Sequence, residues 1–241
     1  MRIIIYARNI TSLDGVGNSV KYFQNALKKN YEVLLVSYHS DIPDVINFKN
    51  YLDIHVDSNI LIYHFSIYDL LQKKLLDLDF KYKIIYYHGI TEPKFFKKDS
   101  QTSLECINGL KQIKNLDSFD LYLANSTYSK NQFSNILKNK VILNKFSIMP
   151  PLNLIDEAMI CDKKNFLDFN NIKFYYLGTL GDHKNVFKLC DLFCSRKKSL
   201  LSILTSTTKE DTCNIIDRNL YNKYVENNIN FYHRLDDKKK N

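Results

Sequence analysis

The sequence has no long hydrophobic run, and its uninterrupted apolar stretches reach about five residues, as at residues 3–7. A membrane-spanning helix needs roughly 20 apolar residues. The N-terminal apolar stretch is also too short for a secretory signal, so residues 2–6 are interpreted as a buried strand. We therefore expect a cytoplasmic protein without a membrane-spanning segment.

Paired cysteines are also lacking. The five cysteines are odd in number, and no two of them are separated by two residues. Cys190 and Cys194 lie four apart on an expected helix, but neither a histidine nor a second cysteine pair completes a zinc set. The pattern predicts five reduced thiols and no metal site.

Arginine is scarce as well, because only five of the 34 basic residues are arginine, although the formal net charge is +8. A nucleic-acid binder would cluster arginine with exposed aromatic residues on one face. Here the lysines are scattered doublets such as Lys28-Lys29 and Lys73-Lys74, which favour solvated helix faces. We expect no nucleic-acid partner, while the excess charge permits peripheral contact with an anionic inner membrane surface.

What the sequence does contain is an alternation of short apolar runs with helical periodicity. Val20, Phe23 and Leu27 form the stripe of an amphipathic helix over residues 18–29. Strands apolar on both faces that alternate with helices predict a doubly wound parallel sheet, an α/β fold. Expected strands are 2–6, 32–37, 59–65, 83–87, 121–124, 146–149, 172–177, 200–204 and 229–232; expected helices are 18–29, 67–78, 102–117, 127–138, 185–194 and 208–226.

Pro150-Pro151 is the clearest break in this alternation, because two consecutive prolines cannot continue a helix or a central strand. We expect a complete N-terminal Rossmann-like domain at 1–150, a linker at 151–171 and a C-terminal Rossmann-like domain at 172–241. The last of these has about 70 residues and only three expected strands, so it is expected to be incomplete.

A glycine turn, Asp14-Gly15-Val16-Gly17-Asn18-Ser19, follows the first expected strand. Such a turn lets the backbone approach a ligand, and the next helix offers free amides to an anion. A tight turn that binds nothing is the alternative. A dinucleotide site, as in an oxidoreductase, would need glycine or alanine in place of Val20 and an acid where Ser37 and Tyr38 stand.

Three histidines, His39, His64 and His88, stand at the ends of expected strands. In an open parallel sheet the ligand crevice lies at the carboxyl ends of the strands. We therefore expect these side chains to gather beside the turn at Gly15 and Gly17. A second glycine turn stands at Gly178, and Lys184 follows it just before the next expected helix. The positive charge of this lysine could neutralise a diphosphate, although such a lysine can equally be a surface residue.

The order of these segments resembles retaining glycosyltransferases of the GT-B fold, of the large family 4 type. The stretch 86–96, YYHGITEPKFF, is the most specific match and puts His88 at the family's active-site histidine position. Other matches are the glycine loop DGVG at 14–17, YHFS at 63–66, LANSTYS at 123–129, MPPL at 149–152 and the donor-phosphate segment GTL…KN at 178–185. The resemblance implies catalytic His88 and substrate contacts from Gly15, Gly17, His64, Ser126, Gly178 and Lys184.

Two departures from the family pattern stand in the second domain. Thr179 replaces an arginine that would contact the donor phosphates, and the late pair of glutamates eight residues apart has no counterpart among Glu157, Glu210 and Glu226. The resemblance implies transfer from a nucleotide-diphosphate sugar, without metal or cofactor, to a glycan or lipid-linked acceptor of a bacterial surface polysaccharide. The departures leave the alternative of an inactive transferase that acts as a binding or partner subunit.

Overall fold

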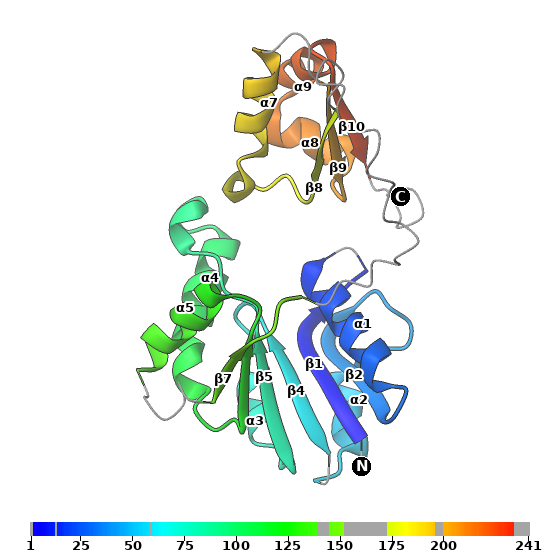
Figure 1. Cartoon of the computed structure of the whole chain (residues 1–241), viewed down its shortest axis with the longest axis vertical. Helices are drawn as coiled ribbons and strands as arrows, with labels where there is room; N and C mark the ends of the chain where they lie inside the picture. The colour runs from blue at the N-terminus through cyan, green and yellow to red at the C-terminus, as the bar shows by residue number, and fades with distance from the viewer. Residues whose placement is uncertain are drawn as a thin grey trace, which may run out of the picture. The chain divides into compact units, whose positions relative to one another are not determined.

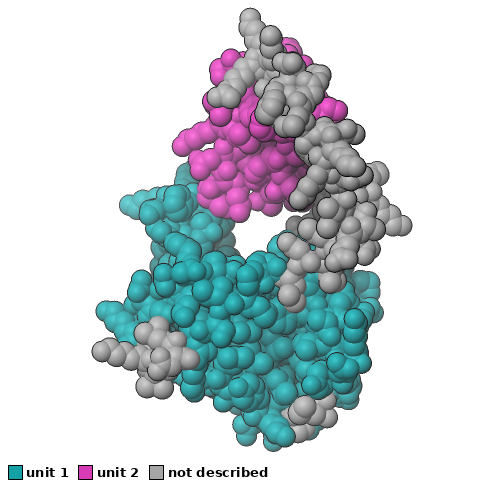
Figure 2. All heavy atoms as spheres, in the orientation of Figure 1, with its two compact units in different colours: residues 1–155 teal, residues 156–241 magenta. Residues whose placement is uncertain are grey.

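The computed structural model describes residues 2–12, 14–57, 59–138, 145–151, 173–195 and 200–233. The chain divides into two compact units, Met1–Ile155 and Asp156–Asn241, which Figure 2 distinguishes by colour. The linker expected at 151–171 lies outside the described residues except for Pro151.

A seven-stranded parallel sheet forms the centre of the first unit (Figure 1). Its strands run in the order β3-β2-β1-β4-β5-β6-β7, so the chain winds outward in both directions from β1. This is the order of a doubly wound sheet, whose winding changes direction between β1 and β4. The strands are β1 (Arg2–Ile10), β2 (Glu32–Ser40), β3 (Ile46–Asn47), β4 (Ile60–Phe65), β5 (Tyr82–Tyr87), β6 (Leu121–Ala124) and β7 (Phe146–Ile148).

Helices cover both faces of this sheet. On one face Val20 and Phe23 of α1 pack on Ile3, Ile5 and Ile62 of the strands. The other face carries the larger core, which is rich in tyrosine and phenylalanine, and four helices contribute to it. The helices are α1 (Gly15–Leu27) on the first face, and α2 (Phe48–Tyr51), α3 (Gln72–Leu76), α4 (Gln101–Gln112) and α5 (Thr127–Leu137) on the second.

The second unit contains a three-stranded parallel sheet in the order β10-β9-β8. Its helices pack on one face, where Val186, Cys190 and Phe193 of α7 join Leu201 and Ile203 in a single core. Tyr175 and Leu177 of β8 are about two-thirds exposed. The elements are β8 (Lys173–Leu177), α7 (Val186–Cys194), β9 (Leu200–Thr205), α8 (Lys209–Ile216), α9 (Arg218–Glu226) and β10 (Ile229–His233).

The structure confirms the expected α/β class, with a Rossmann-like unit followed by a smaller unit that also has a parallel sheet.

The predicted bounds of two helices were wrong. Only Gln72–Leu76 is α-helical within 67–78, because Asp69 turns its side chain back to the amide of Leu71. The helix expected at 208–226 is two helices, separated at Asp217, whose φ of 59° and ψ of 160° no helix allows.

Residues 41–51 hold two short elements, β3 and α2, that the sequence pattern did not predict. Among the described cysteines, Cys106, Cys190, Cys194 and Cys213 are free thiols, and Cys161 lies outside the described residues. No helix within the described ranges has both the length and the apolar character to cross a bilayer.

Candidate functional site

A cavity of about 540 Å³ opens in the first unit at the carboxyl edge of the sheet. Its walls come from the segments that follow five strands: Asp14 to Tyr22 after β1, Ser66 after β4, His88 and Gly89 after β5, Asn125 after β6, and Pro151 after β7. This edge, at the change of winding direction, is where open α/β sheets bind their ligands. We call this cavity the strand-end pocket.

The N-terminus of α1 forms one wall of the pocket. Asp14 is the N-cap residue and accepts a hydrogen bond from the amide of Gly17 at 2.8 Å, while Thr11 donates its hydroxyl to the same carboxylate. Gly15 lines the pocket, and a Cβ built on it would meet nothing within 4 Å. The backbone can therefore approach a ligand at Gly15, as the turn predicts.

Gly17 has a packing role in this turn. It does not line the pocket, and a Cβ there would overlap the carbonyl oxygen of Thr11 and lie 2.9 Å from the Thr11 nitrogen. The absence of a side chain allows α1 to pack directly on the segment that leaves β1. The expected contact of Gly17 with substrate stays a prediction.

His64 and His88 meet at the ends of β4 and β5, which are adjacent in the sheet. Nδ1 of His64 lies 2.9 Å from Nε2 of His88, and the two rings are 5.1 Å apart. His64 is 1% exposed and is not among the residues that line the pocket. Its expected contact with substrate stays a prediction. His88 lies between His64 and the cavity.

Both imidazoles are held neutral by burial. Desolvation lowers the pKa of His88 to about 4, although the nearby negative charge of Asp14 opposes this shift. Desolvation also lowers the pKa of His64 well below its usual value, and the proximity of His88 acts in the same direction. At pH 7 the pair therefore carries no charge.

Asn125 positions the segment that follows β5. Its Nδ2 donates to the carbonyl oxygen of His88 at 2.8 Å, and its Oδ1 accepts from the hydroxyl of Ser129 at 2.6 Å. Ser126, next to it, accepts from the amide of Ser129 and caps α5. Ser126 is not among the residues that line the pocket, and its expected substrate contact stays a prediction.

The strand-end pocket has an unusual charge balance. Among the described residues that line it there is no lysine or arginine, and Asp14 is the one residue with a charged side chain at neutral pH. Ser19, 3% exposed, is among the residues that line the pocket, and its buried Oγ has no hydrogen-bond partner within the described part of the chain. A buried hydroxyl without a partner costs free energy unless a ligand or water satisfies it. These walls suit an uncharged ligand that carries hydroxyl groups.

Sequence reasoning missed Ser19, Tyr22, Ser66 and Asn125 as residues that line the pocket. A usable signal existed for Ser19, because it lies one turn into a helix that begins at a strand end. The predicted position of His39, beside the turn at Gly15 and Gly17, was also wrong. This histidine is exposed on β2 and does not line the pocket, since the ends of β4 and β5 lie on the opposite side of β1.

In the second unit, Gly178 follows β8 with a φ of 154°, and a Cβ there would lie 3.0 Å from the hydroxyl of Tyr176. Lys184 ends a 3₁₀ turn, Asp182–Lys184, just before α7, and is exposed. The two residues therefore stand at the carboxyl edge of β8, where the sequence places a phosphate segment. Their contact with a donor stays a prediction.

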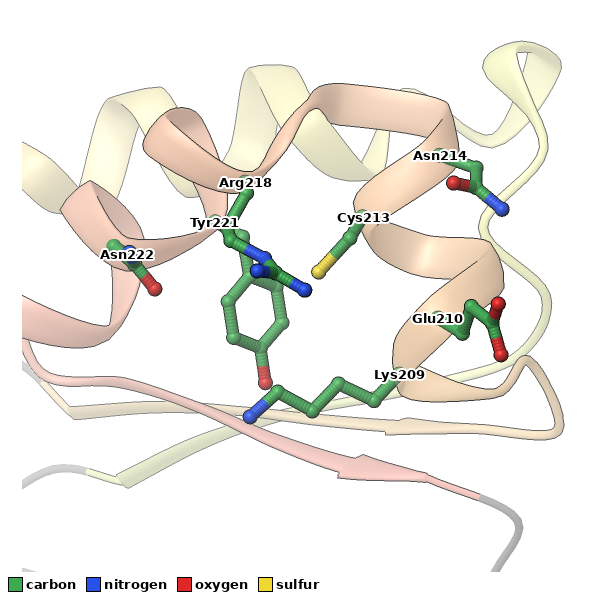
Figure 3. Close-up of a pocket in the computed structure, with 7 residues that line it drawn as sticks. All are labelled: Lys209, Glu210, Cys213, Asn214, Arg218, Tyr221 and Asn222. Carbon is green, nitrogen blue, oxygen red and sulfur yellow. The ribbon is translucent and has the colours of Figure 1, made fainter.

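A second cavity, of about 760 Å³, lies between α8 and α9. Figure 3 shows Lys209, Arg218 and Tyr221 pointing into it. The ammonium of Lys209 stands 5.5 Å from the centre of the Tyr221 ring, within reach of a cation–π interaction. Neither Gly178 nor Lys184 lines this cavity. Within the described residues no group of three or more His, Cys, Asp or Glu side chains could hold a metal ion.

Comparison with solved structures shows a GT-B fold. WaaG, a glycosyltransferase involved in lipopolysaccharide biosynthesis, matches with a TM-score of 0.59 at 12% identity over 99% of this chain and 71% of its own. Anabaena Alr3699/HepE, solved in complex with UDP and glucose, matches with a TM-score of 0.58 at 15% identity over 98% of this chain and 70% of its own.

Sucrose-phosphate synthase from Thermosynechococcus elongatus gives a TM-score of 0.64 at 12% identity, over 98% of this chain and 71% of its own. No family model matches the sequence, and neither does any curated protein. The chain therefore resembles GT-B glycosyltransferases in fold, and the second unit corresponds to part of their second domain.

Proposed function

We propose that the chain is a glycosyltransferase that moves a sugar from a nucleotide-diphosphate sugar to a hydroxyl of a glycan or lipid-linked saccharide in surface polysaccharide biosynthesis. The observation that carries the proposal is the strand-end pocket with His88 and Gly15 in its walls, in a unit of GT-B fold. A net charge of +8 would favour contact with the anionic membrane surface where lipid-linked acceptors lie.

The charges of each unit favour a different chemical group as its ligand. The strand-end pocket has no lysine or arginine among its described lining residues, so it suits hydroxyl-bearing sugar better than a diphosphate. In the second unit the backbone at Gly178 and the exposed ammonium of Lys184 would bind the diphosphate. Positive charge and helix amides there would stabilise the leaving group as the sugar bond breaks, without a metal ion.

The alternative is a binding or partner subunit that transfers nothing. It is favoured by Thr179, which offers no charge where GT-B relatives of the family 4 type are expected to have arginine, and by the missing glutamate pair. Loss of one charge-assisted contact should weaken donor binding roughly ten- to a hundredfold. On either interpretation the chain by itself should bind a nucleotide sugar weakly.

Calorimetric titration of the whole chain with uridine, guanosine and thymidine diphosphate sugars tests the donor, and release of free nucleotide diphosphate tests turnover. We expect Lys184→Gln to weaken binding about tenfold or more. Lys188→Gln, an exposed lysine on the following helix, is the matched control and should leave binding unchanged.

His88→Ala should abolish any turnover while leaving donor affinity within a few-fold of wild type. Donor binding without turnover in the wild-type chain would favour the partner-subunit alternative. No binding to any of the diphosphate sugars, with the fold intact, would refute the proposed transferase.

A further inference from the structure

The pair formed by His64 and His88 has a single hydrogen bond between its two rings. Nδ1 of His64 and Nε2 of His88 are 2.9 Å apart, so one nitrogen carries the proton and the other accepts it. Because both side chains are neutral at pH 7, each ring has one N–H and one bare nitrogen. The direction of this hydrogen bond therefore fixes the tautomer of both residues.

The surroundings of His64 distinguish the two directions. Its other nitrogen, Nε2, is buried and has no hydrogen-bond partner within the described part of the chain. The rings of Phe23 and Tyr86 pack edge to face against it, with centroids 4.9 Å and 5.2 Å away. Aromatic rings offer at best a weak acceptor to an N–H.

If His88 donated the proton, His64 would have to keep its own N–H at Nε2, buried and without a good acceptor. Buried N–H groups without a partner are rarer in proteins than buried acceptors without one. If His64 donates from Nδ1, its Nε2 is a bare nitrogen, which tolerates this apolar contact better. The second arrangement leaves His88 with its proton on Nδ1.

Asp14 favours the same arrangement. It is the charged residue among those lining the pocket, and its negative charge acts on His88 by stabilising positive charge there. An N–H dipole at Nδ1, the nitrogen not used by His64, is stabilised by that field, whereas a bare lone pair is not. No hydrogen bond occupies Nδ1 of His88 from any residue in the described ranges.

We propose that His64 is a positioning residue that donates from Nδ1 to His88, and thereby makes His88 present a protonated Nδ1 to the strand-end pocket. His88 then acts toward a ligand as a neutral hydrogen-bond donor to an oxygen atom, and not as a base that removes a proton. The identity of that oxygen, a sugar hydroxyl, rests on the proposed function; the tautomer does not.

The test is two-bond ¹H–¹⁵N correlation spectroscopy of the ¹⁵N-labelled whole chain near pH 7, which distinguishes Nδ1–H from Nε2–H imidazoles. Histidine-to-phenylalanine variants assign the signals of the six histidines. We expect both His64 and His88 as the Nδ1–H tautomer, by at least about ten to one, because an unpartnered buried donor is disfavoured to that degree. An Nε2–H tautomer at His88 in the wild-type chain would overturn the proposal.

His64→Phe separates positioning from packing, because phenylalanine keeps a ring between Phe23 and Tyr86 and removes only the donor. We expect His88 in this variant to become a mixture of tautomers, with the preference reduced at least about fivefold, while the circular dichroism spectrum is unchanged. His39→Phe, at an exposed strand end, is the matched control and should leave the His88 signals unchanged. An unaltered His88 tautomer in His64→Phe would refute the positioning role, whether or not the chain transfers sugar.

Discussion

Replacement of Gly17 by alanine should destabilise the first unit, although glycine inside a helix is normally the less stable choice. Alanine gains up to about 1 kcal/mol in helix propensity. Its Cβ, however, would overlap the carbonyl oxygen of Thr11 and lie 2.9 Å from the Thr11 nitrogen, and both atoms belong to the backbone. Neither can be displaced by a simple rotation of a side chain.

The expected size follows from the contacts at risk. Forcing an extra methyl group into a packed site costs typically 1–3 kcal/mol. Moving the Thr11 segment or α1 to relieve the overlap also strains the N-cap, in which Asp14 bonds the amide of Gly17 at 2.8 Å, worth about 1 kcal/mol. After the propensity gain, the net loss is about 2 kcal/mol, or about 4–8 °C in melting temperature for a unit of this size.

Gly15→Ala is the matched control, because it adds the same methyl group two residues earlier in the same helix. Its Cβ would meet nothing within 4 Å, so the first unit should keep its stability or gain up to about 1 kcal/mol from helix propensity. Because Gly15 is among the residues that line the strand-end pocket, this variant tests ligand binding instead. The two variants should therefore separate the structural glycine from the one at the pocket.

Because the chain has two compact units, a single melting curve need not be two-state. Hydrogen exchange measured by mass spectrometry on peptides from α1 and β1 reports on the first unit directly. We expect faster exchange in these peptides for Gly17→Ala, and exchange equal to or slower than wild type for Gly15→Ala. Equal exchange in the two variants would refute the steric argument.

Three further predictions concern burial, backbone strain and domain boundaries. Burial raises the pKa of Asp69, so the folded chain binds this proton more tightly than the unfolded chain does. The stability of the wild-type chain relative to Asp69→Asn should therefore fall as pH rises above the pKa of an unfolded aspartate, near 3.9. Urea unfolding of both chains between pH 4 and 7 measures this, and a relative stability that rises with pH would contradict the prediction. Asp217→Gly should stabilise the second unit by about 1 kcal/mol, because φ of 59° with ψ of 160° strains every residue except glycine. Glycine is also a fair N-cap, so little capping is lost. Slower hydrogen exchange in α9 would confirm this prediction, and faster exchange would refute it. Limited proteolysis should leave a resistant fragment that ends near residue 150, and survival of the C-terminal part instead would overturn the expected domain order.

The local pattern of the sequence was sufficient for the strands and most helices. Continuous apolar runs such as 60–63 and 84–87 lie in central strands because burial on both faces needs apolar residues at successive positions. The pattern failed where a single backbone conformation decides, as at Asp217, and where an element is very short, as at Ile46–Asn47. Neither case has a periodic signal.

For the site, the sequence by itself determined that glycines and histidines stand at strand ends, because the end of an apolar run is local information. Which of them meet was decided by strand order, which depends on contacts between distant segments. Adjacent β4 and β5 bring His64 to His88, while β2, on the far side of β1, leaves His39 exposed.

The tertiary structure alone also separated residues that the sequence treated alike. Gly15 and Gly17 are equivalent in the turn pattern, but only Gly15 reaches the pocket, because Gly17 faces the backbone of Thr11. In the same way His88 lines the cavity and His64 lies buried beneath it. Such differences arise from packing within a few ångströms, and spacing along the chain does not encode the direction in which a neighbouring segment will lie.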